Sequence, residues 1–256
     1  MPAARSDGIS DENRGYQKGW RIMYFGMFDP TIIILIPAMI FTFYAQAKVN
    51  SAYNRYAAVR NRRGITGAQA ARIILDRNGL RDVPIEVTNR RLSDHYDPRK
   101  RVMRLSPQVY SDPSIASVSI AAHEAGHAIQ HAKGYAPLSV RNLLAPVVTV
   151  VSNLAWPILI VGLLIIGAGN LFQGNMIFNI GIICYAAAVV FQAVTLPVEY
   201  NASRRAIRQM NEAGIIYIEE TASAKKVLSA AALTYVAALA ASIATLLRIL
   251  ALRGRQ

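Results

Sequence analysis

The sequence predicts a mainly α membrane protein, in which four transmembrane helices carry a small polar α+β region. Charged residues make up only 17% of the 256 residues and apolar residues 53%, whereas soluble domains usually contain about a quarter charged residues. Three long stretches contain no charged residue, and they cover 31–47, 142–198 and 227–247. The formal net charge is nevertheless +13, so the basic residues are concentrated between these stretches. This pattern excludes an ordinary soluble domain, a disordered chain and a disulfide-stapled secreted module.

The apolar stretches set the order of the elements. After a polar N-terminal extension over 1–27, we expect the first transmembrane helix over 28–47. The chargeless stretch over 142–198 is too long for one helix of roughly 20 residues and suits two, helices 2 and 3, with a Gly- and Asn-rich break near 169–175. The fourth helix, over 227–252, is rich in Ala, Ser and Thr, which permits close helix packing in lipid. Buried helices of a soluble protein are the alternative.

Lys and Arg near the helix ends predict the orientation, because they favour the cytoplasmic side. The connection 169–175 has none, whereas basic residues flank the other ends of helices 2 and 3. The polar region over 48–141 and the segment over 199–226 are therefore expected in the cytoplasm, with both termini outside. The basic helical stretch 51–63 has a composition that suits anionic lipid headgroups. Nucleic acid is not an expected partner, since no recognition fold accompanies these arginines.

The polar region is expected to contain two helices and two short strands. Thr66 and Gln69 have capping-box spacing, which predicts a helix over 66–78. An edge strand is expected over 83–88, a polar turn over 92–99 and a second strand over 101–106, which could pair with an extended substrate. A second helix is expected over 114–133, just before Gly134.

The helix expected over 114–133 carries His123, Glu124 and His127 in the pattern H-E-x-x-H. Histidines one helical turn apart share a face, so both imidazoles can bind a single zinc ion at about 2 Å. The intervening Glu124 is then placed to accept a proton from the attacking water. We therefore expect one Zn²⁺ ion, held by His123 and His127, and a general base at Glu124.

The third zinc ligand has to come from elsewhere in the chain. His131 would stand about 12 Å beyond His123 along the helix axis, too far for a shared ion. Lys133 occupies the position at which longer zinc-peptidase patterns place a third histidine. Glu199 lies at the end of the third apolar stretch, on the same predicted side as the histidines. It is a candidate ligand, and the alternative is a carboxylate that merely reaches water.

Four blocks of the sequence resemble the YugP-type neutral zinc metallopeptidases, which are multi-pass membrane proteins of bacteria. The blocks lie at 92–99 (LSDHYDPR), 121–130 (AAHEAGHAIQ), 196–206 (LPVEYNASRRA) and 230–238 (AAALTYVAA). The chain is more distantly similar to HtpX-type membrane proteases. The resemblance implies a zincin-like polar region in the bacterial inner membrane and Glu199 as third ligand, which is the gluzincin type. Ser203 departs from the HtpX-type pattern, which has an acidic residue there that often bonds a ligand histidine.

The residues together predict a membrane-embedded zinc endopeptidase that acts on peptides or membrane proteins. A donor for the transition state is also needed, and His95, Tyr96 and Arg204 are candidates. For His95, a turn residue bonded to Asp94 or Asp97 is an equal alternative. Two other functions stay open: a non-proteolytic zinc-bearing membrane scaffold or regulatory binding protein, and recruitment of lipid or membrane proteins by the basic face. Glu124 argues against the scaffold, which would not need a base.

Overall fold

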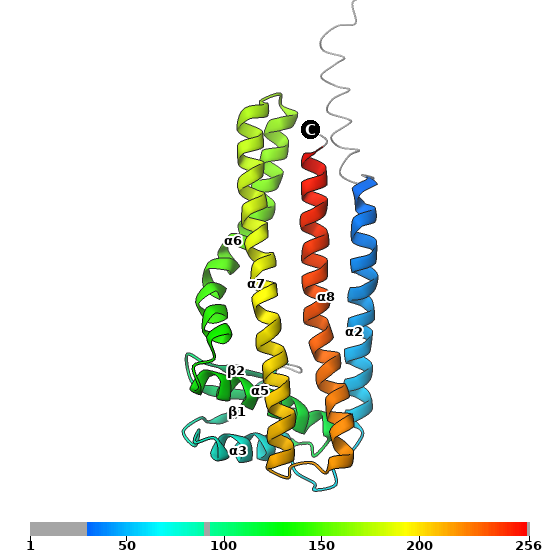
Figure 1. Ribbon diagram of the computed structural model, residues 1–256, viewed down its shortest axis with the longest axis vertical. Helices are drawn as coiled ribbons and strands as arrows, with labels where there is room; N and C mark the ends of the chain where they lie inside the picture. The colour runs from blue at the N-terminus through cyan, green and yellow to red at the C-terminus, as the bar shows by residue number, and fades with distance from the viewer. Residues whose placement is uncertain (1–29, 90–92, 255–256) are drawn as a thin grey trace, which may run out of the picture.

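Four long helices form the frame of the molecule in the computed structural model, which describes residues 30–89 and 93–254. The predicted extension over 1–27 lies outside these residues. The helices run along one axis and the polar elements gather at one end (Figure 1). The long helices are α2 (Leu35–Ala57, preceded by the 3-10 turn η1, Pro30–Ile34), α6 (Ala136–Gly167), α7 (Leu171–Glu212) and α8 (Thr221–Arg253).

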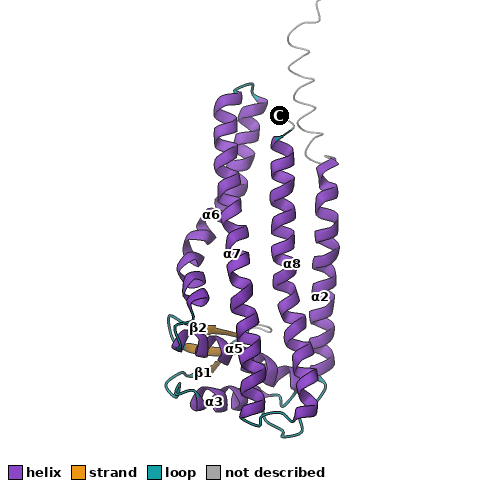
Figure 2. Ribbon diagram, viewed as in Figure 1, coloured by secondary structure: helices purple, strands orange, loops and turns teal. Residues whose placement is uncertain are grey.

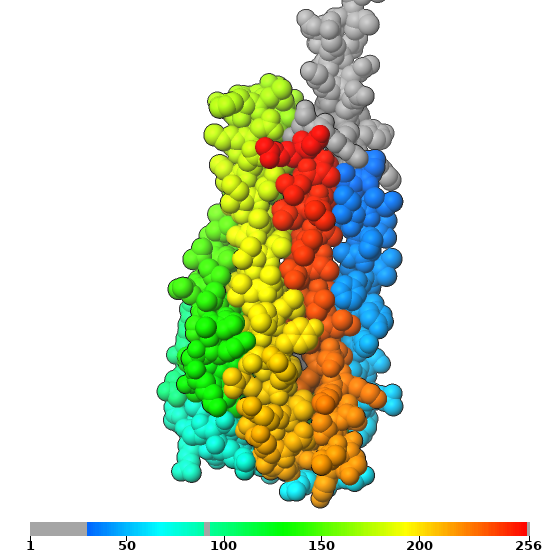
Figure 3. Space-filling model, viewed as in Figure 1, coloured from blue at the N-terminus to red at the C-terminus, as the bar shows by residue number. Residues whose placement is uncertain are grey.

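All four long helices are long and apolar enough to cross a membrane. Large apolar side chains on them point outward: Phe43, Leu143 and Ile183 are 69%, 75% and 70% exposed. Such exposure is costly in water and favourable in lipid. In the space-filling view, α8 lies between α7 and α2, and both of these helices pack against it (Figure 3). The prediction of a mainly α membrane protein is confirmed.

Helix α7 links the apolar part of the molecule to the polar part. The sequence predicts that the third apolar helix ends near Val198, but α7 continues to Glu212 and includes Pro197 within it. At 1.5 Å per residue, its 42 residues span about 63 Å. One helix therefore carries Glu199 from the apolar stretch directly onto the elements of the polar region.

The polar region packs short helices around a three-stranded sheet (Figure 2). Its elements are α3 (Gly67–Arg77), β1 (Ile85–Val87), β2 (His95–Asp97), β3 (Val102–Leu105), α4 (Pro107–Ser111), α5 (Ile115–Ala132) and the 3-10 turn η2 (Ile218–Glu220). The capping box of Thr66 and Gln69 is present at the start of α3, as predicted. Ser114, at the start of the helix predicted over 114–133, caps α5 by accepting the Ser117 N–H at 3.1 Å.

The sheet has the order β1-β3-β2, with β1 parallel and β2 antiparallel to β3. The prediction of an edge strand at 83–88 is confirmed by β1. The expectation that 101–106 pairs with a substrate strand is wrong, because both sides of β3 are already paired. The segment expected to be a turn forms β2 instead, since a tight connection in which Asp97 accepts the N–H groups of Arg99 and Lys100 folds it back onto β3.

The end of the basic stretch over 51–63, which follows α2, contacts other polar elements. Helix α2 ends at Ala57, before the predicted end of this stretch at position 63. The N–H of Arg62 donates to Glu220 at 2.9 Å, and the Arg62 side chain lies 3.8 Å from Glu219. The guanidinium groups of Arg62 and Arg63 also lie over the ring of Tyr217. These arginines therefore hold the connection between α7 and α8 against the end of α2.

Helices α5 and α7 cross with almost no space between their backbones. A Cβ atom added to Gly126 of α5 would lie 2.7 Å from the carbonyl oxygen of Ala202 on α7. Ala125, Ala202 and Ala206 are fully buried around this crossing. A glycine at this point lets the H-E-x-x-H helix lie directly on the part of α7 that carries Glu199.

We expect Gly126→Ala to lower the free energy of unfolding by about 1–2 kcal/mol. Overpacking against backbone costs about 1–3 kcal/mol and outweighs the roughly 1 kcal/mol that alanine gains over glycine within a helix. Thermal unfolding of the detergent-purified protein measures the effect. Gly254→Ala is the control, because its added carbon would meet nothing closer than 3.8 Å. Equal unfolding midpoints for the two variants would contradict the close crossing.

Candidate metal centre

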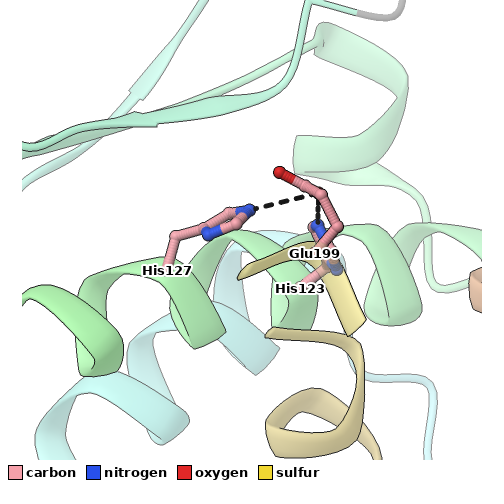
Figure 4. Close-up of side chains that lie close together, drawn as sticks. All are labelled: His123, His127 and Glu199. Atoms are coloured by element: carbon pink, nitrogen blue, oxygen red, sulfur yellow. Dashed lines mark hydrogen bonds and ion pairs between the residues drawn. The ribbon is translucent and has the colours of Figure 1, made fainter. Parts of the chain in front are cut away.

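The two histidines of the motif lie on one face of α5, one helical turn apart. Their rings meet edge to face, with centroids 4.8 Å apart. Both imidazoles point towards the carboxylate of Glu199 on α7 (Figure 4). The Glu199 Oε2 atom lies 3.2 Å from His123 Nε2 and 3.6 Å from His127 Nε2. One ligand atom from each of the three residues lies within 4.8 Å of the others, so the structure brings the three predicted ligands together.

Ser203 bonds the nitrogen of the His123 ring that faces away from Glu199. Its Oγ atom lies 3.1 Å from His123 Nδ1, which leaves Nε2 facing Glu199. Metal-binding histidines usually bond a protein acceptor through their other nitrogen, which fixes the ring and its tautomer. Ser203 therefore makes the contact expected of an acidic residue in the HtpX-type pattern.

Gln130 holds the ring of His127, and its own partners assign the tautomer. Gln130 Nε2 donates to the carbonyl of Val198 at 2.8 Å and to Asn201 Oδ1 at 3.0 Å. Both amide hydrogens are thus used, so Gln130 Oε1 accepts from His127 Nδ1 at 2.9 Å. Arg205 Nε also donates to Asn201 Oδ1, at 2.7 Å, which fixes that oxygen as an acceptor. His127 consequently turns the lone pair of Nε2 towards the shared centre.

Arg141 on α6 completes the surroundings of Glu199. Its Nη1 atom donates to Glu199 Oε1 at 3.0 Å, while Oε2 faces the imidazoles. The Glu199 side chain is only 4% exposed, and a carboxylate is rarely buried so deeply without a partner. Arg141 therefore keeps one oxygen occupied and leaves the other for an ion.

Glu124 lies beside this group but bonds away from it. Its Oε2 atom accepts the backbone N–H of Tyr96 from the free edge of β2 at 3.0 Å. Burial raises the pKa of Glu124 to about 7, although the nearby His123 imidazole acts to lower it. A carboxyl group with this pKa exchanges protons readily near neutral pH.

A cavity of about 170 Å³ opens over the three ligands and Glu124. Its lining combines residues of β2 and its flanks with residues of α5, α6, α7 and α8: Asp94, His95, Tyr96, Pro98, His123, Glu124, His127, Leu138, Arg141, Glu199 and Tyr235. Most of its walls are polar.

The three predicted transition-state donors lie in different places. His95 lines the cavity, and its Nδ1 atom donates to the carbonyl of Ser93 at 2.7 Å and not to Asp94 or Asp97. The hydroxyl of Tyr96 bonds His131 Nδ1 at 2.9 Å, so only its backbone serves Glu124. Arg204 lines a separate cavity together with Lys225, away from the ligands.

Sequence reasoning missed Gln130, Arg141 and Tyr235 at this site. Gln130 follows His127 by three residues, a spacing that places it on a neighbouring part of the helix surface. Arg141 is a basic residue just before the second apolar stretch, and a basic residue at that place indicates orientation and not a site. Tyr235 lies within an apolar stretch, and nothing in its local sequence indicates a site.

The donor set fits zinc. Two imidazole nitrogens and one carboxylate oxygen are the ligands of a catalytic zinc ion that keeps its fourth position for water or substrate. Both imidazoles are held through Nδ1 and both offer Nε2. Such a group next to a buried glutamate, in a helical membrane protein, is characteristic of a membrane zinc metallopeptidase.

The chain belongs to the family described as "putative neutral zinc metallopeptidase", whose model matches residues 31–254. It is similar to the "putative membrane protease YugP" of Bacillus subtilis (strain 168). The two chains are 48% identical over 217 residues, which cover 85% of this chain and 93% of the relative. No solved structure matches.

We expect Gln130→Leu to weaken zinc binding by about 10- to 100-fold, because His127 loses the partner that orients its ring. Competition with a zinc-binding dye, on protein purified in detergent, measures the affinity. Gln173→Leu is the matched control, since Gln173 is exposed in the first turn of α7. Equal affinities for both variants would contradict the role of Gln130.

Proposed function

We propose that this protein is a zinc-dependent endopeptidase of the H-E-x-x-H gluzincin type. His123, His127 and Glu199 are the proposed ligands of one zinc ion, and Glu124 is the proposed general base. The observation that carries this proposal is the convergence of three ligand atoms within 4.8 Å, beside a buried carboxylate that makes no bond to them.

When bound at these residues, zinc supplies the Lewis acid that activates water and polarises the scissile carbonyl. Glu124 accepts the proton of the attacking water and later donates it to the leaving amine. The Tyr96 N–H holds Oε2 of Glu124 in place, so the carboxylate is already oriented when substrate arrives. Arg141 bonds Oε1 of Glu199 and so leaves Oε2 turned towards the histidines.

Two side chains on the cavity wall suit stabilisation of the oxyanion. His95 is the predicted donor that remains at the site; because its Nδ1 donates to the carbonyl of Ser93, its Nε2 can donate only from the imidazolium form. Tyr235 of α8, which also bonds Glu199, has a hydroxyl on another part of the wall. Preorganised donors of this kind typically contribute 10²- to 10³-fold to the rate.

The proposed substrate is an extended peptide or a segment of a membrane protein. The free edge of β2 reaches Glu124 through Tyr96, which supports pairing of a substrate strand at this edge in place of β3. Glu199 follows the apolar part of α7 directly, which supports cleavage close to the membrane surface. The proposed location is the bacterial inner membrane, with the site on the cytoplasmic side. The name of the relative, a membrane protease, supports the membrane location and the proteolytic activity.

A zinc-bearing scaffold that cleaves nothing is the alternative. It accounts for the three ligands but not for Glu124, whose burial beside them serves no structural bond except that to Tyr96. Recruitment of lipid by the basic stretch is less favoured, since the guanidinium of Arg62 lies 3.8 Å from Glu219 and those of Arg62 and Arg63 lie over the ring of Tyr217.

We expect Glu124→Gln to abolish cleavage of unfolded casein while the zinc content stays at one ion per chain. The ligands remain in this variant, but the base is lost. Chelation of the wild type should give the same loss of cleavage, and added zinc should restore it. Glu86→Gln, an exposed substitution on β1, is the control. Cleavage that persists in Glu124→Gln would contradict the assignment.

We expect Glu199→Ala to lower the zinc-to-protein ratio measured by mass spectrometry of the metal. His127→Ala should act in the same direction, since each variant removes one of three ligands. Glu219→Ala removes an exposed glutamate and should leave the ratio unchanged. A full ratio in Glu199→Ala would show that this carboxylate is no ligand, even if proteolysis is zinc-dependent.

A further inference from the structure

A second cavity of about 340 Å³ lies beside the metal centre, between α2, α5, α7 and α8. It shares five lining residues with the first cavity: Asp94, His123, Glu124, Glu199 and Tyr235. The two cavities therefore meet at the candidate ligands and the proposed base. One leads from them towards β2 and α6, and the other leads from them towards α2 and α8.

The walls of the second cavity away from the ligands are mostly apolar. The apolar residues are Val49 of α2, Ile120 of α5, and Val227, Leu228, Ala231 and Ala232 of α8, and Tyr53, Ser203 and Thr234 add hydroxyl groups. The two alanines are short side chains on the wall, and they leave the space that larger residues would fill. No Lys or Arg occurs among the described residues that line it. An acidic side chain would lose its hydration here without gaining a basic partner.

The edge of the cavity on α2 is polar. Gln46 and Asn50 lie one helical turn apart, are both exposed, and bond each other through Gln46 Nε2 and Asn50 Oδ1 at 3.2 Å. Primary amides offer both donors and acceptors, so this pair suits the polar backbone of an extended peptide. An apolar pocket with a few polar groups at its edge is the usual design of a binding site, and such sites measure about 300–1,000 Å³.

We propose that this second cavity is a specificity subsite, which takes the apolar side chain of a residue that flanks the scissile bond. This proposal rests on the proposed function, since the cavity begins at the proposed base and ligands. The substrate class is therefore peptide segments with a Leu-, Met- or Phe-sized residue at that position. The small residues of α8 set the size that is accepted, and Val49 bounds it from α2.

Two substitutions of opposite effect test the proposal. Ala231→Leu fills the cavity from α8 and Val49→Ala enlarges it from α2. Ala222→Leu is the matched control, because Ala222 is an exposed residue of α8 outside the cavity. Each variant, purified as the full chain, digests unfolded β-casein, and mass spectrometry identifies the cut sites. Peptide pairs that differ only in Leu or Ala at the preferred position then give kcat/KM ratios.

The wild type and Ala222→Leu should prefer an apolar residue at one position beside the cut. Ala231→Leu should lower the Leu-to-Ala ratio at least about tenfold, since a single methylene in an apolar pocket changes kcat/KM by about 10- to 200-fold. Val49→Ala should shift the preference towards Phe, with the zinc content unchanged in both variants. Preferences that match the wild type in both cavity variants would overturn the subsite. No cleavage by the wild type would overturn the proposed function instead.

Discussion

The close crossing of α5 and α7 is the contact on which the rest of the site depends. The histidines belong to one helix and Glu199 to the other, 72 positions after His127 in the sequence. Only where Gly126 meets the backbone of Ala202 are the two helices near enough for the Glu199 carboxylate to reach both imidazoles. Because α7 is continuous from the apolar stretch to Glu212, this contact also fixes the position of the site relative to the apolar helices.

Around this crossing, each of the three candidate ligands bonds a group of a different kind through the atom that faces away from the shared centre. Ser203 holds His123, the amide of Gln130 holds His127, and the guanidinium of Arg141 holds Glu199. Burial of polar and charged groups costs stability unless their bonds are satisfied. These contacts satisfy the inner atoms of each ligand and leave the outer atoms directed at one point. The apolar helices thus serve as more than an anchor, since α6 and α7 deliver Arg141 and Glu199.

Much of this arrangement follows from the sequence. Chargeless stretches predict the four long helices, the Thr66 capping box predicts α3, and the spacing of His123 and His127 predicts a shared face of α5. The end of the third apolar stretch predicts only where hydrophobicity stops, whereas α7 goes on because its next turns pack against α5. The strand β2 and the roles of Gln130, Arg141 and Tyr235 depend on contacts between distant segments. Local patterns contain no record of such contacts.

Zinc X-ray absorption of the purified full-length protein tests the central claim most directly, because it reports which atoms bind the ion. The structure predicts scattering from two imidazole rings, with nitrogen and oxygen ligands at about 2.0–2.2 Å. Glu124→Gln should leave these imidazole features in place, since Glu124 is not a proposed ligand. A shell with fewer than two imidazoles, or one that contains sulfur, would contradict the account of a His123–His127–Glu199 centre.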